Sequence, residues 1–243
     1  MSRRLDLELV ARGLARSRSH AQALISAGQV RVDGAVVRRA AVVVPAAALV
    51  EADTDHYVSR GAHKLVGALD DLGLAVPARA LDAGSSTGGF TQVLLERGAR
   101  QVVAVDVGTG QLSEPLRSDP RVRLFEQTNL RDLTLAHVDE QPVDLVVADV
   151  SFISLTLLLR PLTAATASDG ALLLLVKPQF EVGRERLGPG GVVRADHLRH
   201  AAVAAVATAA EELGWTGQAT VPARVAGESG NQEYFLLLRR GSS

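Results

Sequence analysis

The sequence predicts an α/β protein, with a doubly wound, mostly parallel sheet preceded by a small α+β module. First, from residue 79 onward short aliphatic segments such as VDLVVADV and ALLLLVK alternate with helix-like segments, a pattern typical of parallel strands buried by helices. Second, residues 1–40 hold eight arginines against three acids. Third, composition and charge change near residues 55–59, which places a domain boundary between residues 1–58 and 59–243.

Length and composition exclude several classes of protein. The 243 residues are 47% hydrophobic, enough to build a real core. Cysteine is absent, which removes disulfides, thiol nucleophiles and cysteine-ligated zinc, and the six histidines show no metal-ligand spacing, so no metal is expected. Apolar runs are too short to span a bilayer and no secretion leader is evident. We therefore expect a cytoplasmic protein without membrane contact.

The first 37 residues predict two short helices and a β-hairpin. Apolar residues recur at helical spacing in both helical segments. Ser17 is placed to cap the second helix and Gly28 to close it. The segment QVRVDGAVV then alternates around an Asp-Gly turn, which is typical of a hairpin.

The segment GLARSRSHAQALISAGQVRVDGAVV resembles an S4 domain, a small RNA-binding module. The net charge of the whole chain is −1, so residues 1–40 carry +5 and the remainder carries −6. A basic segment on an acidic protein fits a polyanionic partner. The alternatives are a helical cap without a ligand and a merely solvated arginine surface. The resemblance implies that five side chains, three of them at or near the start of the second helix, bind RNA: Arg3, Arg4, Arg16, Arg18 and Gln22.

The rest of the chain predicts strands and helices in alternation. Strands are expected at 79–84, 101–107, 121–126, 143–150, 171–177, 217–225 and 233–240, and helices at 88–98, 153–166 and 195–213, the last capped by Asp196. Such sheets bind ligands at the carboxyl ends of their strands, where the strand order reverses.

The loop LDAGSSTGGF follows the first of these strands. Gly84, Gly88 and Gly89 allow a tight turn and close backbone approach to a ligand, and Asp106 at the end of the second strand could accept both hydroxyls of a ribose. A glycine turn after a strand can also be purely structural. The loop differs from G-x-G-x-x-G and resembles the S-adenosylmethionine loop of FtsJ-like methyltransferases, within a Rossmann-like class I methyltransferase sheet.

That resemblance implies a set of contacts to S-adenosylmethionine. Asn129, in the segment TNLRDL, is the least secure of them because it could equally cap a helix. The implied contacts are Asp82, Gly84, Ser85, Ser86, Thr87, Gly88, Gly89, Phe90, Asp106, Val107, Asn129, Leu130 and Asp149.

The chain contains 24 arginines and only two lysines, Lys64 and Lys177. Arginine stays protonated, whereas a desolvated lysine can release its proton, more readily beside a second ammonium group. We therefore predict that Lys177, at the end of the strand ALLLLVK, is a general base assisted by Lys64. The alternative is a strand-end lysine that reaches water.

Two acids complete the pattern. Asp149 ends the fourth strand of the sheet and Glu233 begins the last. The order Lys64, Asp149, Lys177, Glu233 resembles the catalytic tetrad of ribose 2′-O-methyltransferases. The resemblance implies that Asp149 orients the amine of Lys177 and contacts the donor, and that Glu233 fixes Lys64 or the target ribose.

The motifs SRGAHKL, DVSFISL, KPQFEVGRE and GNQEYF, joined to an S4-like module, resemble the TlyA family of hemolysin A-like proteins. The resemblance implies 2′-O-methylation of cytidines in 16S and 23S ribosomal RNA, with ribosomal subunits as partners. One departure is TDHY before VSRG, where some relatives have a basic, tryptophan-containing linker, which leaves the coupling between the two domains open.

Three other functions fit the sequence less well. A membrane-active hemolysin is disfavoured because the sequence offers no spanning segment. DVSF after the fourth strand, in place of an Asn-Pro-Pro-Tyr-like motif, weighs against a base-nitrogen methyltransferase. A noncatalytic RNA-binding or ribosome assembly factor would not need the tetrad.

The loop EVGRERLGPGGVVRAD predicts either a mobile lid over RNA or an ordinary connection. The sequence does not specify the target nucleotides, and a monomer is the favoured state.

Overall fold

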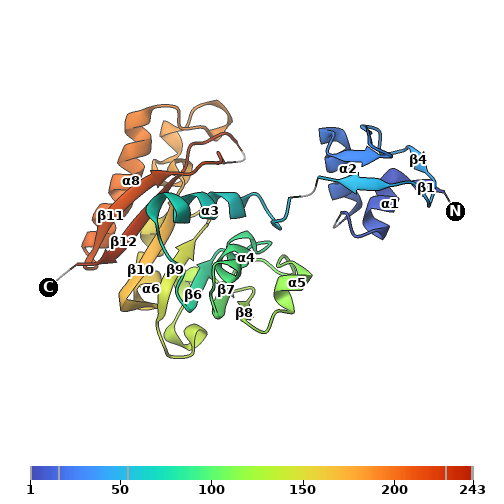
Figure 1. Cartoon of the computed structure of the whole chain (residues 1–243). Helices are drawn as coiled ribbons and strands as arrows, with labels where there is room; N and C mark the ends of the chain where they lie inside the picture. The colour runs from blue at the N-terminus through green and yellow to red at the C-terminus, as the bar shows by residue number, and fades with distance from the viewer. Residues whose placement is uncertain (1, 16, 54, 228, 242–243) are drawn as a thin grey trace. The chain divides into compact units, whose positions relative to one another are not determined.

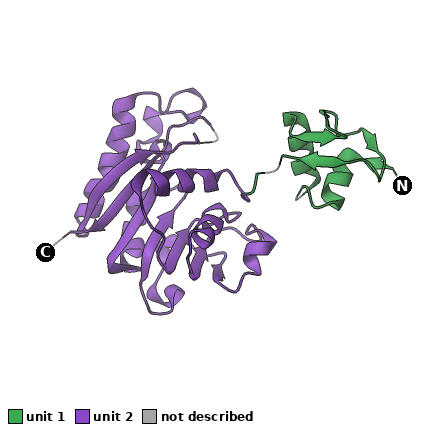
Figure 2. Ribbon diagram, viewed as in Figure 1, with its two compact units in different colours: residues 1–56 green, residues 57–243 purple. Residues whose placement is uncertain are grey.

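The structure, a computed structural model, describes residues 2–15, 17–53, 55–227 and 229–241. It divides into two compact units, residues 1–56 and residues 57–243 (Figure 2).

The first unit contains the two helices and the hairpin expected from the sequence. The Ser17 side chain accepts a hydrogen bond from the amide of His20, and Gly28 ends the second helix in the left-handed conformation at φ 76°. Strands β3, β2 and β5 form one sheet, and β1 pairs with β4. The elements are β1 Arg3–Arg4, α1 Leu5–Ala11, α2 Arg18–Ala27, β2 Val30–Val32, β3 Ala35–Val36, β4 Val43–Val44 and β5 Val50–Ala52.

The second unit is built on a seven-stranded sheet in the order β11-β12-β10-β9-β6-β7-β8 (Figure 1). The run from β10 to β8 is parallel, whereas β12 is antiparallel to both of its neighbours. The predicted doubly wound, mostly parallel sheet is confirmed. Its strands are β6 Arg79–Ala83, β7 Gln101–Val105, β8 Val122–Phe125, β9 Val143–Ala148, β10 Thr166–Val176, β11 Trp215–Pro222 and β12 Tyr234–Arg240.

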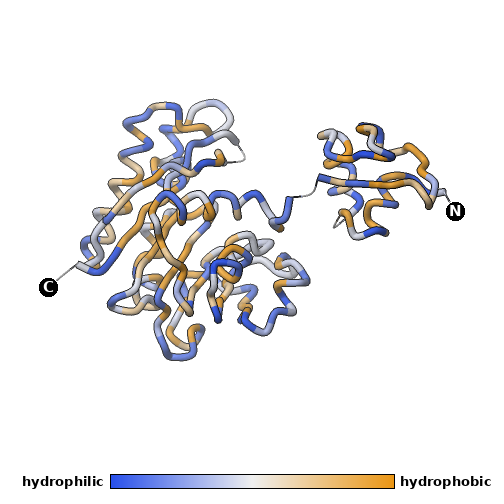
Figure 3. The backbone as a smooth tube through the Cα atoms, in the orientation of Figure 1, coloured by the Kyte–Doolittle hydropathy of each residue, from blue (hydrophilic) through white to orange (hydrophobic). Residues whose placement is uncertain are grey.

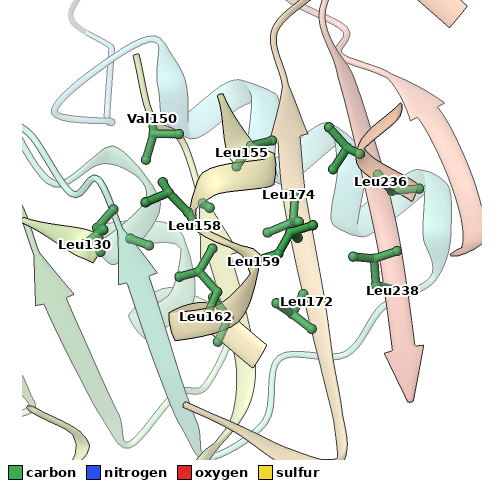
Figure 4. Close-up of a cluster of buried hydrophobic side chains, with 14 of the residues drawn as sticks. Leu130, Val150, Leu155, Leu158, Leu159, Leu162, Leu172, Leu174, Leu236 and Leu238 are labelled. Carbon is green, nitrogen blue, oxygen red and sulfur yellow. The ribbon is translucent and has the colours of Figure 1, made fainter. Parts of the chain in front are cut away.

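Successive side chains of each strand point to opposite faces of the sheet, so both faces are apolar. Helices cover each face and form two hydrophobic cores. In β6, Leu81 and Ala83 belong to a cluster with residues of α6 and α8, whereas Ala80 belongs to a cluster with residues of α3 and α4. Figure 4 shows part of the first cluster, including Leu159 and Leu162 of α6. Figure 3 shows hydrophobic colour along the central strands. The α-helices are α3 Gly61–Leu72, α4 Gly89–Glu96, α5 Glu114–Arg117, α6 Leu159–Ala164, α7 Pro178–Glu181 and α8 Asp196–Glu211; short 3-10 helices are η1 Leu130–Asp132, η2 Leu135–Val138, η3 Leu155–Leu157, η4 Arg184–Arg186 and η5 Pro189–Gly191.

Two local predictions were wrong. The continuous helix expected at 153–166 is instead η3 followed by α6. Pro161 has no amide proton and is tolerated only in the first turn of a helix, so α6 begins just before it. The N-cap of α8 is Ala195, and the predicted cap Asp196 is the first helical residue, where it pairs with Arg199 at 3.3 Å.

No helix among the described residues has both the length and the apolar character needed to cross a membrane.

Candidate active site

The candidate site lies at the carboxyl ends of β6 and β9, which are neighbours at the centre of the sheet. From β6 the chain continues outward to β7 on one side of the sheet, whereas from β9 it continues outward to β10 on the opposite side. Strand order therefore reverses between β6 and β9, which is where open α/β sheets bind ligands. The amide of Asp149 donates to Ala83 O at 3.0 Å and joins the two strand ends.

Two glycines let the loop after β6 pass close to its neighbours. Gly84 has φ 90°, and a Cβ atom there would lie 2.6 Å from the carbonyl oxygen of Asp149. A Cβ at Gly89 would collide with Ser59 Oγ and lie 3.0 Å from the amide of Ala62. The loop after β6 and the start of α3 are thus in backbone contact, and only glycine fits.

Asp106 holds the loop from the end of β7. Its Oδ2 accepts from the amide of Ser86 at 2.8 Å, and its Oδ1 accepts from the amide of Gly108 at 2.7 Å. Each carboxylate oxygen can accept a further bond, so the half-buried Asp106 could also receive two ribose hydroxyls. Ser86 is exposed and its Oγ donates to Gln111 Oε1 at 3.2 Å. The next residue, Thr87, is half-buried.

Two polar side chains of the segment LDAGSSTGGF are buried, Asp82 at the end of β6 and Ser85 in the turn that follows. Asp82 is fully buried and accepts from Thr91 Oγ1 at 2.6 Å. Burial, together with the charges of Asp149 and Asp106, raises the pKa of Asp82 to about 7. Within the described part of the chain, Asp82 Oδ1 and the buried Ser85 Oγ have no hydrogen-bond partner. The loop therefore concentrates negative charge and unsatisfied polar atoms, which suits a cationic, hydroxyl-bearing ligand.

The remaining candidates for donor contacts differ in exposure. Phe90 is 3% exposed and stacks on Phe235 with ring centroids 6.1 Å apart, so its ring belongs to the core. Val107 is 73% exposed next to Asp106. Asn129 accepts from the amide of Arg131 at 3.0 Å and caps η1, the alternative left open by the sequence, while Leu130 is buried.

The four tetrad residues form two ion pairs. Lys177 Nζ lies 2.6 Å from Asp149 Oδ1, and Lys64 Nζ lies 2.7 Å from Glu233 Oε2. The sheet register explains the proximity of these residues, because Tyr234 of β12 pairs with Val176 of β10. Glu233 directly precedes Tyr234 and Lys177 directly follows Val176, so the two residues lie at the same end of these antiparallel strands.

The start of α3 brings Lys64 to this edge. A Cβ at Gly61 would lie 3.6 Å from Asp149 Oδ2, which places the first turn of α3 against the carboxylate. Lys64 and Lys177 are each 9% exposed and Glu233 is 2% exposed. Buried charges are tolerated only when paired, as these are. The carboxylate of Glu233 offsets the charge of Lys64, which reduces the electrostatic effect of Lys64 on nearby groups.

Sequence reasoning missed three polar residues near the tetrad, two of which contact it. Lys177 Nζ donates to the exposed Ser151 Oγ at 2.8 Å, and Gln179 Nε2 donates to Glu233 Oε1 at 3.3 Å. Glu181 accepts from Ser154 Oγ at 2.5 Å, and burial raises its pKa. Their positions within DVSFIS and KPQFE, directly after two tetrad residues, were the available signal.

The glycine-rich segment after α7 is tied to the site by Asn231. This residue is 2% exposed, accepts from the amide of Val193 at 2.9 Å and donates to Gly191 O at 3.1 Å. Since Asn231 lies two residues before Glu233, one end of the segment is anchored beside the tetrad. Whether the segment acts as a lid stays a prediction.

In the first unit, the candidate RNA contacts gather around one acid that the sequence analysis did not single out. Arg4, Arg18 and Gln22 all donate to Asp6. Arg3 lies 3.9 Å from Glu8. The fifth candidate, Arg16, lies outside the described residues.

Comparison with known proteins gives consistent matches. The FtsJ-like methyltransferase family model matches residues 57–240 and the S4 domain model matches residues 3–49. The 16S/23S rRNA (cytidine-2′-O)-methyltransferase TlyA of Mycobacterium tuberculosis is 55% identical, over 97% of this chain and 89% of the relative. The 23S rRNA (cytidine-2′-O)-methyltransferase TlyA of Campylobacter jejuni is 39% identical, over 74% and 69%. A solved structure described as a hemolysin from Streptococcus thermophilus is 35% identical, with TM-score 0.78 over 100% of this chain and 90% of that one.

Proposed function

This chain belongs to the TlyA family of FtsJ-like methyltransferases that carry an S4 domain, and we propose that it methylates the 2′-hydroxyl of cytidines in 16S and 23S ribosomal RNA with S-adenosylmethionine as donor. The family predicted from the sequence is confirmed. The observation that carries the proposal is the pair of buried lysine–carboxylate contacts, Lys177–Asp149 and Lys64–Glu233, beside the glycine loop.

The loop after β6 fits the proposed donor. When bound, S-adenosylmethionine supplies an activated methyl group on a sulfonium centre. Asp106 would accept the ribose hydroxyls, and the unpartnered Ser85 Oγ would bond the polar methionine end. The carboxylate of Asp149 would attract the cationic portion. The raised pKa of Asp82, partly caused by Asp149 and Asp106, supports this electrostatic fit, because a bound cation would relieve the repulsion.

The tetrad fits the acceptor. A ribose hydroxyl is a poor nucleophile until its proton begins to leave, so a positioned base should supply much of the acceleration. Lys177 would take that proton, with its amine directed by Asp149 and by Ser151 Oγ. Lys64, held by Glu233, would steady the developing negative charge on the 2′-oxygen.

The basic first unit fits the substrate. Its arginines would contact phosphates of ribosomal RNA, which supplies affinity and register, while the tetrad selects the reacting hydroxyl. The 39% identical Campylobacter jejuni relative is named for 23S RNA alone and the 55% identical relative for both RNAs. The closer identity favours both subunits as substrates.

The proposed function is tested by identifying the methylated nucleoside that the protein produces. Purified 30S and 50S subunits that lack 2′-O-methylcytidine are incubated with the full chain and isotope-labelled S-adenosylmethionine, and the RNA is digested to nucleosides for mass spectrometry. We expect label in 2′-O-methylcytidine from both subunits. Label in a base-methylated nucleoside would refute the ribose assignment, and methylation of only one subunit would refute dual specificity.

A further inference from the structure

Asp6 is a buried acid in a module, residues 3–49, where eight arginines outnumber three acids. It is the second residue of α1 and is 0% exposed. Arg4 donates to it twice, from Nε to Oδ1 and from Nη2 to Oδ2, both at 3.1 Å. Arg18 Nε donates to Oδ2 at 2.9 Å and Gln22 Nε2 donates to the same oxygen at 3.1 Å. One carboxylate thus joins side chains from β1 and α2.

The bonded arginines keep part of their surface for a ligand. The Arg4 and Arg18 side chains are 42% and 55% exposed. A guanidinium group has five N–H donors, so one that bonds Asp6 through Nε and one Nη can still bind a phosphate through the others. Arg18 is also the first residue of α2, and a helix N-terminus favours a negatively charged group such as a phosphate.

Asp6 is fully ionised in the folded protein. Hydrogen bonds from Arg4 hold the pKa of this carboxyl well below its usual range, against the opposing effect of burial. A permanent negative charge on this module repels phosphates and so lowers its affinity for RNA of any sequence. Asp6 also restricts the conformations of three side chains, because Arg4, Arg18 and Gln22 each have several rotatable bonds and all three bond the same buried carboxylate. Such restriction lowers the entropy that is lost when a ligand binds.

We propose that Asp6 is a positioning residue for RNA recognition, whose carboxylate holds Arg4, Arg18 and Gln22 in the arrangement that distinguishes structured ribosomal RNA from RNA at large. This inference rests on the proposed function of the chain as a ribosomal RNA methyltransferase. It assigns Asp6 to specificity, whereas simple charge compensation would affect all RNAs equally.

Three variants of the full chain separate geometry from charge. Asp6→Asn removes the charge and turns one acceptor into a donor. Asp6→Glu keeps the charge but displaces the carboxylate by one methylene. Asp33→Asn is the matched control: it removes one charge from the same unit, at an exposed turn with φ 49° where asparagine is tolerated and can still accept from the amide of Leu49.

The readout is a ratio of affinities measured without methyl donor. Binding to 30S and 50S subunits is compared with binding to poly(U), so the result does not depend on whether methyl transfer occurs. We expect both Asp6 variants to lower the subunit-to-poly(U) ratio by roughly tenfold, the effect of losing hydrogen bonds to a charged group. Asp33→Asn should leave the ratio unchanged.

Thermal melting of each variant checks the fold. If Asp6→Asn is unfolded at the assay temperature, Asp6→Glu decides. The proposal is overturned if a folded Asp6 variant keeps the wild-type ratio, or if Asp6→Asn tightens binding to both RNAs equally, as Asp33→Asn is expected to do. It is also overturned if both Asp6 variants are unfolded, since Asp6 would then be a determinant of the fold. Failure of the wild-type chain to methylate subunits would instead contradict the proposed function.

Discussion

At the level of single residues, the proposed proton transfer depends on the environment of two lysines. Both are nearly buried and each is paired with one carboxylate. Arginine could form the same ion pairs with stronger hydrogen bonds, but it could not release a proton. A chain with 24 arginines that keeps lysine at these two positions therefore points to proton transfer rather than to charge alone.

Ser151 provides a prediction at this scale. Its hydroxyl accepts from Lys177 Nζ at 2.8 Å and helps to direct the amine. We expect Ser151→Ala to lower the single-turnover methylation rate roughly tenfold, because a small misplacement of a base is costly, while the affinity for S-adenosylmethionine is retained. Ser118→Ala, at the exposed end of α5, is the control. An unchanged rate would exclude Ser151 from positioning the base.

Asp82 provides a prediction on pH. Its ordinary pKa of 3.8 is raised to about 7 in the folded protein, so the folded state binds more protons than the unfolded state between these values. The contribution of Asp82 to stability is thus fully present below about pH 4 and is lost as pH rises through about 7.

Asp82→Asn cannot ionise and should not show this loss. We expect the free energy of unfolding of the variant, relative to wild type, to increase by more than about 1 kcal/mol between pH 4 and pH 8. Urea denaturation of both proteins across this range provides the measurement. Parallel pH curves for the two proteins would show that Asp82 ionises normally.

At the scale of elements, the sheet is what brings distant residues together. The pairing of Tyr234 with Val176 aligns Glu233 with Lys177, and the contact of β6 with β9 brings the glycine loop to Asp149. The site is therefore fixed by register, and a change that shifts a strand end should impair donor binding.

Gly84 tests this directly. An alanine there would be strained at φ 90° and its Cβ would meet the carbonyl oxygen of Asp149 at 2.6 Å. We expect Gly84→Ala to cost about 1–3 kcal/mol of stability and to weaken S-adenosylmethionine binding at least tenfold by calorimetry. Gly98→Ala is the matched control, since Gly98 has φ 106° but open space around it. Equal donor affinity in the two variants would contradict a role for the Gly84–Asp149 contact.

Much of this architecture was predictable from local sequence. Strands rich in Val and Leu, the glycine loop and the Ser17 and Gly28 caps follow from short-range patterns, and the meeting of strand ends at a switch point follows from the rules for doubly wound sheets. The break before Pro161 is local as well, because proline lacks the amide proton that a helix interior requires. The positions of Ser151 and Gln179 beside tetrad residues were a signal in the sequence, but their contacts were not predictable, because they join segments that meet only in the folded chain. The same holds for the bonds of Asp6 to α2.

At the scale of the whole molecule, charge is divided between two units. Residues 1–40 carry an excess of five positive charges, but Glu51, Asp53 and Asp55 reduce the excess of the whole first unit, residues 1–56, to two, and residues 57–243 carry a net charge of −3. We propose that the arginines of the first unit attract RNA, whereas the larger unit carries out methyl transfer.

This division predicts a salt effect confined to substrate binding. Because contacts to phosphates release counterions, the KM for ribosomal subunits should rise at least tenfold between 50 and 200 mM salt. The kcat should change little, since the tetrad is nearly buried and its ion pairs are weakly screened. Steady-state kinetics at several salt concentrations test this, and a kcat that falls in parallel would show that salt acts on the reaction itself.

We propose that the amine of Lys177 removes the proton from a ribose hydroxyl. Single-turnover methylation of unmodified subunits by Lys177→Arg, combined with calorimetry of S-adenosylmethionine binding, tests this role. If Lys177 is the general base, the variant binds the donor with an affinity near that of wild type and loses at least a hundredfold in rate, because its charge is kept but arginine does not release its proton. A variant that methylates cytidine at close to the wild-type rate would contradict it.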